Sequence, residues 1–331
     1  MYSRNRPDAY PRWKSRRESW SCWLARPLTA VLIVPLLIAI SACGSRQEPP
    51  APAAVDKAFV LTSRAAGTAF SKGAYGQAAD LYRQALARAY ARDDREAIVD
   101  TQCNLAVVLL RLGAPEEARA VVEEAKAELA RAEQVVPVRL VLLEATVLYR
   151  TGETAAAWDI SEQLLAGAAE AEPGVMAKAQ FLCGLLAAER GDEGRLRASI
   201  AALAKANDPA LRADLTELRG YLAMTEHHWE AAVQAFDATA DLRRETLDYV
   251  GMMRALARAG EASERYGRQR AAAVYYLRAG RSASQLGWQR EAVDWLMRAQ
   301  SLARQAGDTR TLQAILAYLA RLQEREPGQG R

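Results

Sequence analysis

Residues 73–85 read GAYGQAADLYRQA and contain the pattern that decides the fold. A glycine suited to a turn is followed by a segment in which Ala78, Tyr82 and Ala85 recur at spacings of four and three residues. Residues at these spacings lie on one face of an α-helix. The pattern therefore predicts a turn followed by a helix that packs through small side chains and one aromatic ring.

Equivalent positions recur along the chain at a nearly constant interval. The residues at the position of Ala78 are Ala118, Ala157, Leu196, Ala232 and Ala272, separated by 40, 39, 39, 36 and 40 residues. The fullest later copies contain Gly220, Trp229, Ala232 and Phe236, and then Gly260, Ala272, Tyr276 and Ala279. A period of this length is typical of stacked helix pairs, each of which covers the apolar face of the next.

This pattern resembles the tetratricopeptide repeat (TPR). That family places a small residue near the middle of the first helix, an alanine early in the second and an aromatic residue shortly after it. The family repeat is about 34 residues long, so the helices of this chain are expected to be longer, and Leu196 departs from the usual alanine. The resemblance implies an all-α fold, a right-handed α-solenoid of about seven antiparallel helix pairs.

Seven glycines separate the predicted helices. They are Gly73, Gly113, Gly152, Gly191, Gly267, Gly287 and Gly307. The segments between predicted turns are each about one helix long, which predicts roughly fourteen helices. A second register fits the C-terminal part through Tyr276, Ala279, Gly280, Ala292, Leu296 and Ala299. The last four helices can therefore be paired in either of two ways.

The N-terminal region has a different character. An apolar run of thirteen residues, Leu28 to Ile40, ends in the tetrapeptide Ile40–Cys43, which resembles a bacterial lipobox. The run contains Pro35 and is shorter than the roughly 20 residues needed to cross a bilayer. The resemblance implies that residues 1–42 are a signal peptide that is removed and that Cys43 is lipidated, so that a lipid anchor holds the protein to a membrane.

The remaining domain boundaries follow from composition. Residues 43–55 are rich in proline and predict a tether after the lipidated cysteine, residues 56–325 form the solenoid, and residues 326–331 are expected to be a disordered tail. Gly44 stands where aspartate favours inner-membrane retention in enteric-type bacteria, so the lipoprotein resemblance implies the outer membrane, facing the periplasm.

Charge argues against nucleic acid as a partner. The whole chain carries a formal charge of +4, but residues 1–42 contain seven basic and two acidic residues. Their removal leaves 37 basic and 38 acidic residues, a net charge of −1. A chain with that balance has no uniform field to attract a phosphate backbone, and we expect no nucleic-acid binding.

No catalytic, metal or cofactor signature is present. His227 and His228 precede Trp229 at a predicted turn, and adjacent residues do not share a helix face. Cys103 and Cys183 lie on first helices two repeats apart, farther than a disulfide spans, so we expect buried free thiols. The expectations are no enzyme activity, no metal and no cofactor.

The inner, first-helix surface is the predicted binding groove, since repeats of this kind usually hold peptides there. The resemblance places these residues in the groove: Arg111, Arg139, Tyr149, Arg150, Lys178, Phe181 and Tyr221, with Asp214, Glu217, Glu261 and Glu264 toward its end. A basic and aromatic groove suits an acidic group or a C-terminal carboxylate. Packing is the expected role of Trp158, Trp229, Trp288 and Trp295, although Trp288 and Trp295 could form a docking face if exposed.

Three functions follow as hypotheses. The first is a non-enzymatic envelope lipoprotein that binds a protein or peptide as a scaffold or assembly factor for a pilus, a secretion pore or barrel assembly. The alternative is a lipoprotein that activates or regulates peptidoglycan metabolism. A small-ligand carrier is the weakest hypothesis, because the helical pattern predicts no convergent polar pocket.

Overall fold

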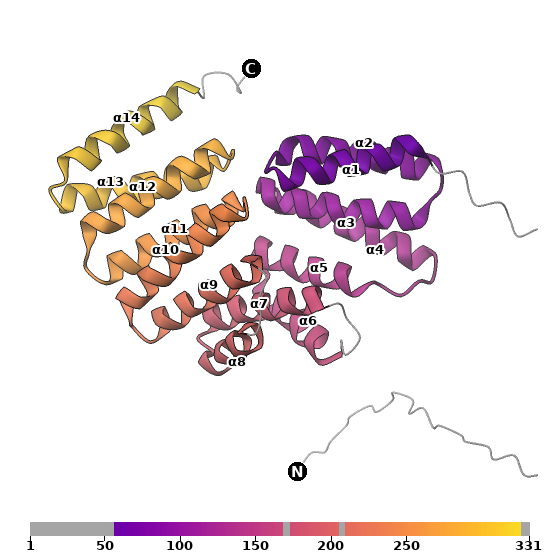
Figure 1. Ribbon diagram of the computed structural model, residues 1–331, viewed down its shortest axis with the longest axis horizontal. Helices are drawn as coiled ribbons and strands as arrows, with labels where there is room; N and C mark the ends of the chain where they lie inside the picture. Colours follow the sequence, from indigo (N-terminus) through magenta and orange to yellow (C-terminus); the bar gives the residue numbers. More distant parts are fainter. Residues whose placement is uncertain (1–55, 168–172, 205–208, 326–331) are drawn as a thin grey trace, which may run out of the picture. The chain divides into compact units, whose positions relative to one another are not determined.

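The computed structural model describes residues 56–167, 173–204 and 209–325, and these ranges form fourteen α-helices (Figure 1). The helices are α1 Lys57–Ser71, α2 Tyr75–Ala91, α3 Arg95–Leu112, α4 Pro115–Arg131, α5 Val138–Thr151, α6 Thr154–Gly167, α7 Pro173–Arg190, α8 Glu193–Leu203, α9 Pro209–Thr225, α10 Trp229–Glu245, α11 Tyr249–Arg265, α12 Gln269–Gln285, α13 Gln289–Gln305 and α14 Thr309–Arg325. Consecutive helices pack against each other throughout this part of the chain. The predicted all-α solenoid of helix pairs is therefore confirmed.

Residues in the left-handed backbone conformation follow the ends of the helices. All seven predicted turn glycines have positive φ, between 63° and 89°. The remaining turns between consecutive helices in the described ranges use residues other than glycine, namely Asp93, Glu133, His227 and Leu247. A side chain in this conformation costs roughly 1–2 kcal/mol, so these turns are held by their hydrogen bonds and not by backbone preference.

The same pair of hydrogen bonds closes both kinds of turn. After α1, the amide of Ala74 donates to the carbonyl of Ala69 at 2.9 Å, and the amide of Gly73 donates to the carbonyl of Phe70 at 2.9 Å. After α2, Asp94 donates to the carbonyl of Ala89 in the same way, at 3.1 Å. These bonds satisfy carbonyls that a helix end leaves free. Because the same bonds form whether or not the left-handed residue is glycine, the positions of the glycines indicate only some of the turns.

Small residues let the helices of a pair approach closely. The six residues at the aligned second-helix position are fully buried: Ala78, Ala118, Ala157, Leu196, Ala232 and Ala272. On the facing first helix, a Cβ atom placed on Gly220 would lie 2.8 Å from the ring of Phe236. Interiors are packed too tightly to accept that atom without displacement, so the glycine is a packing requirement.

Both registers predicted for the C-terminal helices occur. Gly260 of α11 faces Tyr276 of α12, and Gly280 of α12 faces Leu296 of α13. Helix α12 is therefore the second helix of one pair and the first helix of the next. It also contacts α14 directly, as first helices of neighbouring repeats do elsewhere in this chain.

The cysteines and tryptophans serve packing. Cys103 in α3 and Cys183 in α7 are buried, unpaired thiols, and burial raises the pKa of both, that of Cys183 to about 11. Trp288 is buried, and Trp295 is half-buried against the core. Neither side chain is exposed as a docking face would require, and Trp158 and Trp229 are also half-buried.

Within the described ranges, none of the helices combines the length and the apolarity needed to cross a membrane. The predicted signal peptide, Cys43, the tether over 43–55 and the tail over 326–331 lie outside these ranges.

The packing role of glycine can be tested with Gly220→Ala. We expect this change to lower the free energy of unfolding by about 1–3 kcal/mol, because the added methyl overlaps Phe236. Gly76→Ala in α2 is the matched control, since a Cβ there meets no atom within 4 Å; it should leave stability unchanged or raise it by up to about 1 kcal/mol. Urea denaturation followed by circular dichroism measures both, and equal effects would contradict the close-packing explanation.

Candidate binding cavity

The first helices of successive pairs enclose a cavity of about 350 Å³. Its wall is built by α3, α5, α7, α9 and α11, with Arg243 from α10 and Asp248 from the turn before α11. Each first helix presents residues three or four positions apart to the cavity, for example Val107 and Arg111 from α3. The sequence placed the groove on this surface, and the cavity lies there.

Six of the seven predicted groove residues line the cavity. They are Arg111, Arg139, Tyr149, Arg150, Lys178 and Phe181. Asp214 and Glu217 line it as well, whereas Glu261 and Glu264 do not. The small residues of the repeat set the helix phase, and this phase brings the predicted residues of α3, α5 and α7 to the cavity lining.

Tyr221 lies outside the lining of the cavity. Its ring meets Phe236 edge to face at a centroid distance of 5.2 Å, and the guanidinium of Arg258 lies 5.5 Å from the Tyr221 ring centroid. Tyr221 follows Gly220, where α9 and α10 approach closely. Its ring contacts α10 through Phe236 and α11 through Arg258, and it is not among the residues that line the cavity.

Helices that are distant in sequence close the cavity. Arg111, at the end of α3, forms an ion pair with Asp248, the N-cap of α11, across 137 residues of sequence. The indole of Trp288 donates to the carbonyl of Arg111 at 3.3 Å. A Cβ atom on Gly113 would lie 2.9 Å from this indole. Side-chain contacts thus join the second repeat to the last repeats and bound the cavity.

A buried ionic network forms one wall. Arg243 of α10, whose side chain is 8% exposed, binds Asp214 and Glu217 at 2.7 Å each and Asp248 at 3.0 Å. Asp214, fully buried, also accepts from Lys178 at 2.6 Å. With the Arg111 pair, three cations meet three carboxylates. Buried charges persist only when they are matched in this way.

The pKa values of the network reflect burial opposed by charge. Burial raises the pKa of Glu217 above its usual value despite the nearby Arg243. Burial acts in the same direction on Asp248, but Arg111 and Arg243 outweigh it and hold the pKa of Asp248 below its usual value. The three carboxylates raise the pKa of Arg243 against its own burial, so this arginine stays charged.

Two arginines of the cavity have no carboxylate partner. The guanidinium groups of Arg150 and Arg254 lie 5.4 Å and 4.8 Å from the ring of Trp288. Within the described ranges no carboxylate lies within ion-pair distance of either. Burial lowers the pKa of Arg150 to about 10, and the nearby Arg111 adds to this effect, yet the group remains charged at neutral pH. The cavity therefore retains positive charge beside an indole.

Four important residues of this site were absent from the predicted groove. They are Arg243, Asp248, Arg254 and Trp288. Arg243 lies on a second helix and Asp248 in a turn, both outside the first-helix positions that the family pattern predicts. Trp288 reaches Arg111 only because the solenoid closes. Arg254 could have been predicted from the sequence, because it lies on the first helix α11, six residues before Gly260, at a position facing the inner surface.

The described residues include no cluster of histidine, cysteine or carboxylate side chains suited to a metal ion. His227 and His228 are exposed in the turn between α9 and α10, as expected, and His228 lies 3.1 Å from a carboxylate oxygen of Glu226. Their position is a helix boundary and offers no further ligand.

A model of a known protein family matches part of the sequence. The sequence model of the family described as Anaphase-promoting complex subunit 5 matches residues 67–136 and 269–326, less than half of the chain. No curated protein matches the sequence. The match therefore covers the two ends of the solenoid and leaves its middle uncovered.

Solved structures of other helical repeat proteins are similar. A Rap protein complexed with Competence and Sporulation Factor shares 15% identity, with 76% of each chain covered and a TM-score of 0.52. The apo form of RapI shares 10% identity over 78% of this chain and 75% of that chain, with a TM-score of 0.47. A tetratricopeptide repeat protein from Parabacteroides merdae shares 14% over 78% and 99%, with a TM-score of 0.42. At such identities the likeness concerns fold alone, and the chain is a TPR-like α-solenoid.

The network can be tested with Arg243→Met, which leaves three buried carboxylates without their shared cation. We expect a loss of about 3–5 kcal/mol in the free energy of unfolding. Arg244→Met is the matched control, because the neighbouring Arg244 is exposed and pairs with Asp241 on the surface; its effect should stay below about 1 kcal/mol. Denaturant unfolding at neutral pH distinguishes the two, and similar losses would mean that the network contributes little.

The destabilisation by Arg243→Met should also depend on pH. Arg243 is the cation that opposes the effect of burial on Glu217, so its loss raises the folded-state pKa of Glu217 further above the unfolded value, and ionisation of this carboxyl destabilises the fold. This penalty is absent where Glu217 is protonated, and it grows as pH rises through the raised pKa. The difference from the wild type should therefore be smaller near pH 4, about the ordinary carboxyl pKa, than near pH 7.

Proposed function

We propose that this chain is a non-enzymatic, lipid-anchored envelope protein whose solenoid binds a protein partner, as a scaffold or assembly factor. The inner cavity takes an acidic or carboxylate-terminated segment of that partner. The observation that carries the proposal is the pair Arg150 and Arg254, which flank Trp288 with no carboxylate of the described residues within ion-pair distance. The other cations of the cavity lining all form ion pairs: Arg111, Arg139, Lys178 and Arg243.

The charge pattern favours an anionic group. An arginine can bind a carboxylate through two parallel hydrogen bonds, and the indole covers the apolar atoms beside it. Arg150 and Arg254 are half-buried, so part of their desolvation cost is already met before a ligand carboxylate binds. The apolar side chains around them, Val107, Leu142 and Phe181 among others, suit the hydrophobic part of a peptide.

The size of the cavity limits what can enter. A volume of about 350 Å³ lies near the lower end of the range of roughly 300–1,000 Å³ that ligand sites occupy. It admits a chain end or a few side chains but no folded domain. The partner therefore enters the cavity as an extended segment.

The comparisons are consistent with a binding role. The Rap protein of similar fold is solved in complex with Competence and Sporulation Factor. Helical repeat proteins of this type bind peptides or proteins, and a stack of helix pairs offers a long inner surface for this purpose. The envelope location rests on the tetrapeptide Ile40–Cys43, and the outer-membrane assignment rests on Gly44.

Crosslinking in cells tests the cavity. A photoreactive residue at Tyr149 or Phe181 should capture a protein partner, and the same residue at the exposed Val135 should not. Adding Arg150→Gln and Arg254→Gln should reduce the capture of that partner by about tenfold, corresponding to the loss of one to two charge-assisted contacts.

Arg219→Gln is the matched control, because Arg219 is exposed on α9 and does not line the cavity. Capture from Val135 alone would remove the cavity from the binding surface. Retention of the protein on purified wall sacculi without any protein partner would favour the peptidoglycan alternative over the scaffold.

Cys43→Ala tests the anchor. We expect loss of lipid labelling and release of the protein from the membrane fraction, because the thiol is the lipid acceptor and one buried acyl CH₂ contributes about 0.8 kcal/mol to membrane affinity. Metabolic labelling with a fatty acid and membrane fractionation measure these effects. Continued lipid incorporation in the variant would show that Cys43 is not the acceptor.

A further inference from the structure

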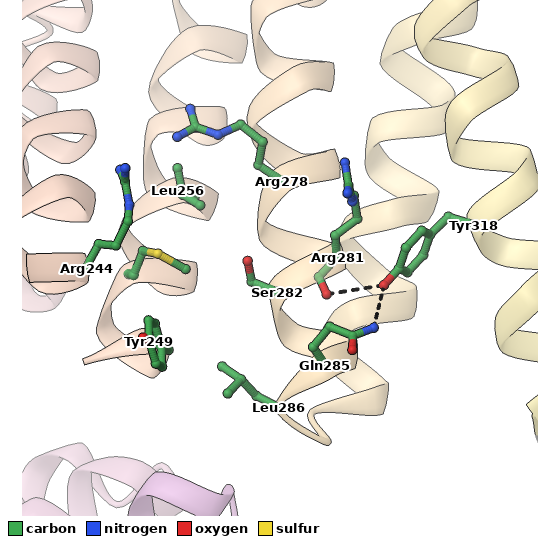
Figure 2. A pocket seen from close by; sticks show the side chains of 10 residues that line it. Arg244, Tyr249, Leu256, Arg278, Arg281, Ser282, Gln285, Leu286 and Tyr318 are labelled. Atoms are coloured by element: carbon green, nitrogen blue, oxygen red, sulfur yellow. Dashed lines mark hydrogen bonds between the residues drawn. The ribbon is translucent and has the colours of Figure 1, made fainter. Parts of the chain in front are cut away.

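A second hollow, of about 640 Å³, lies between α10, α11, α12 and α14 (Figure 2). Its deep side is apolar: Leu256 is buried, and Met252 and Leu286 are half-buried. Arg244 and Arg281 stand at its exposed side. An apolar base with cationic groups around its opening is the form of a docking site for a segment that is both apolar and acidic.

The hollow is distinct from the inner cavity. The two share none of their lining residues, although α11 contributes to both. Tyr249, Met252 and Leu256 of α11 face the hollow, whereas Val250 and Arg254 of the same helix face the cavity. A ligand in the hollow is therefore recognised by different side chains, whatever occupies the cavity.

One side of the hollow is preorganised. The amide of Gln285 donates to the hydroxyl of Tyr318 at 3.0 Å, and this hydroxyl donates to the carbonyl of Arg281 at 3.5 Å (Figure 2). The guanidinium groups of Arg281 and Arg321 lie 5.9 Å and 5.1 Å from the Tyr318 ring. The phenol is thus fixed between α12 and α14, and little ordering is needed when a ligand binds.

Positive charge around the hollow is only partly compensated. No lining residue carries a carboxylate. Arg244 pairs with Asp241, and Arg278 pairs with Asp237 at 3.4 Å, both in solvent-exposed contacts that contribute little. Among the residues whose side chains the structure describes, which exclude 323–325, no carboxylate lies within ion-pair distance of Arg281.

The surrounding sequence extends this charge. Residues 269–325, which form α12 to α14, contain nine arginines and four acidic residues, although the chain from Cys43 onward has a net charge of −1. The C-terminal helices are therefore the basic part of an otherwise slightly acidic solenoid, and they attract an acidic partner to this end.

We propose that this hollow docks an acidic segment of a partner protein, with an apolar or aromatic side chain on the base formed by Met252, Leu256 and Leu286. Acidic side chains of the segment bind Arg244, Arg278 and Arg281 at the opening. The shape favours a peptide over nucleic acid, because the arginines surround one apolar hollow and do not form the continuous charged track that a phosphate backbone follows. A hollow also fits a side chain better than it fits a flat membrane surface.

The test uses the full-length protein and a fluorescein-labelled peptide of repeating Glu-Leu-Asp-Phe units. Fluorescence anisotropy should show binding that weakens as the NaCl concentration rises. Arg281→Glu should raise Kd by about tenfold, since it places a like charge against the peptide. Replacing Leu and Phe of the peptide by Ser should abolish binding, because the apolar base then gains no contact.

Two control variants locate the site. Arg304→Glu changes the same charge on an exposed residue of α13 that does not line the hollow, and its Kd should stay within about twofold of the wild type. In a protein that also carries Arg150→Gln and Arg254→Gln, which remove the cationic groups of the inner cavity, Arg281→Glu should still raise the Kd about tenfold; binding in the hollow is thereby measured separately from the proposed function. Three results would overturn the proposal: no binding, equal weakening by Arg281→Glu and Arg304→Glu, or tighter binding of a single-stranded oligonucleotide or of anionic lipid vesicles than of the peptide.

Discussion

The close approach of neighbouring helices is the constraint on which the rest of this structure depends. Alanine and glycine at the contacts bring the helices together, and bulky side chains from the facing helix fill the space above them. Phe236 against Gly220 and Leu296 against Gly280 are two examples. Because each pair is fixed in this way, the first helices present a predictable set of side chains to the inner surface. The cavity is a consequence of that packing.

The contacts between distant repeats also bring charged side chains together. Asp248 and Arg111 come from repeats far apart in sequence, and Arg243 joins Asp248 to the carboxylates of α9. A buried ion pair of this kind contributes specificity more readily than stability, since desolvation offsets most of the attraction. In the same structure, no carboxylate of the described residues lies within ion-pair distance of Arg150 or Arg254 beside Trp288, and these two arginines give the cavity its chemical character.

Helix α11 occupies a special place because opposite faces of it line the two hollows of the solenoid. Helix α12 packs as a second helix on α11 and as a first helix on α13, and it contributes to the lining of the larger hollow. Its contact with α14, of the kind that first helices of neighbouring repeats make elsewhere in the chain, forms the far side of that hollow.

The sequence by itself determined the helices, their turns at seven glycines, the buried alanines and the inner position of Arg111, Arg139, Tyr149, Arg150, Lys178 and Phe181. These features depend on the local periodicity of apolar residues and on side chains that are small or, in glycine, absent. Both can be recognised from residues close together in the sequence. The turns at Asp93, Glu133 and Leu247 were not predicted, because hydrogen bonds and not residue type hold their backbone. Only the tertiary structure decided which cations are neutralised, which are not, and that Trp288 meets Arg111. The contacts of Arg111 with Asp248 and Trp288 join residues 137 and 177 positions apart, and their distance in space follows from the summed packing of every repeat between them.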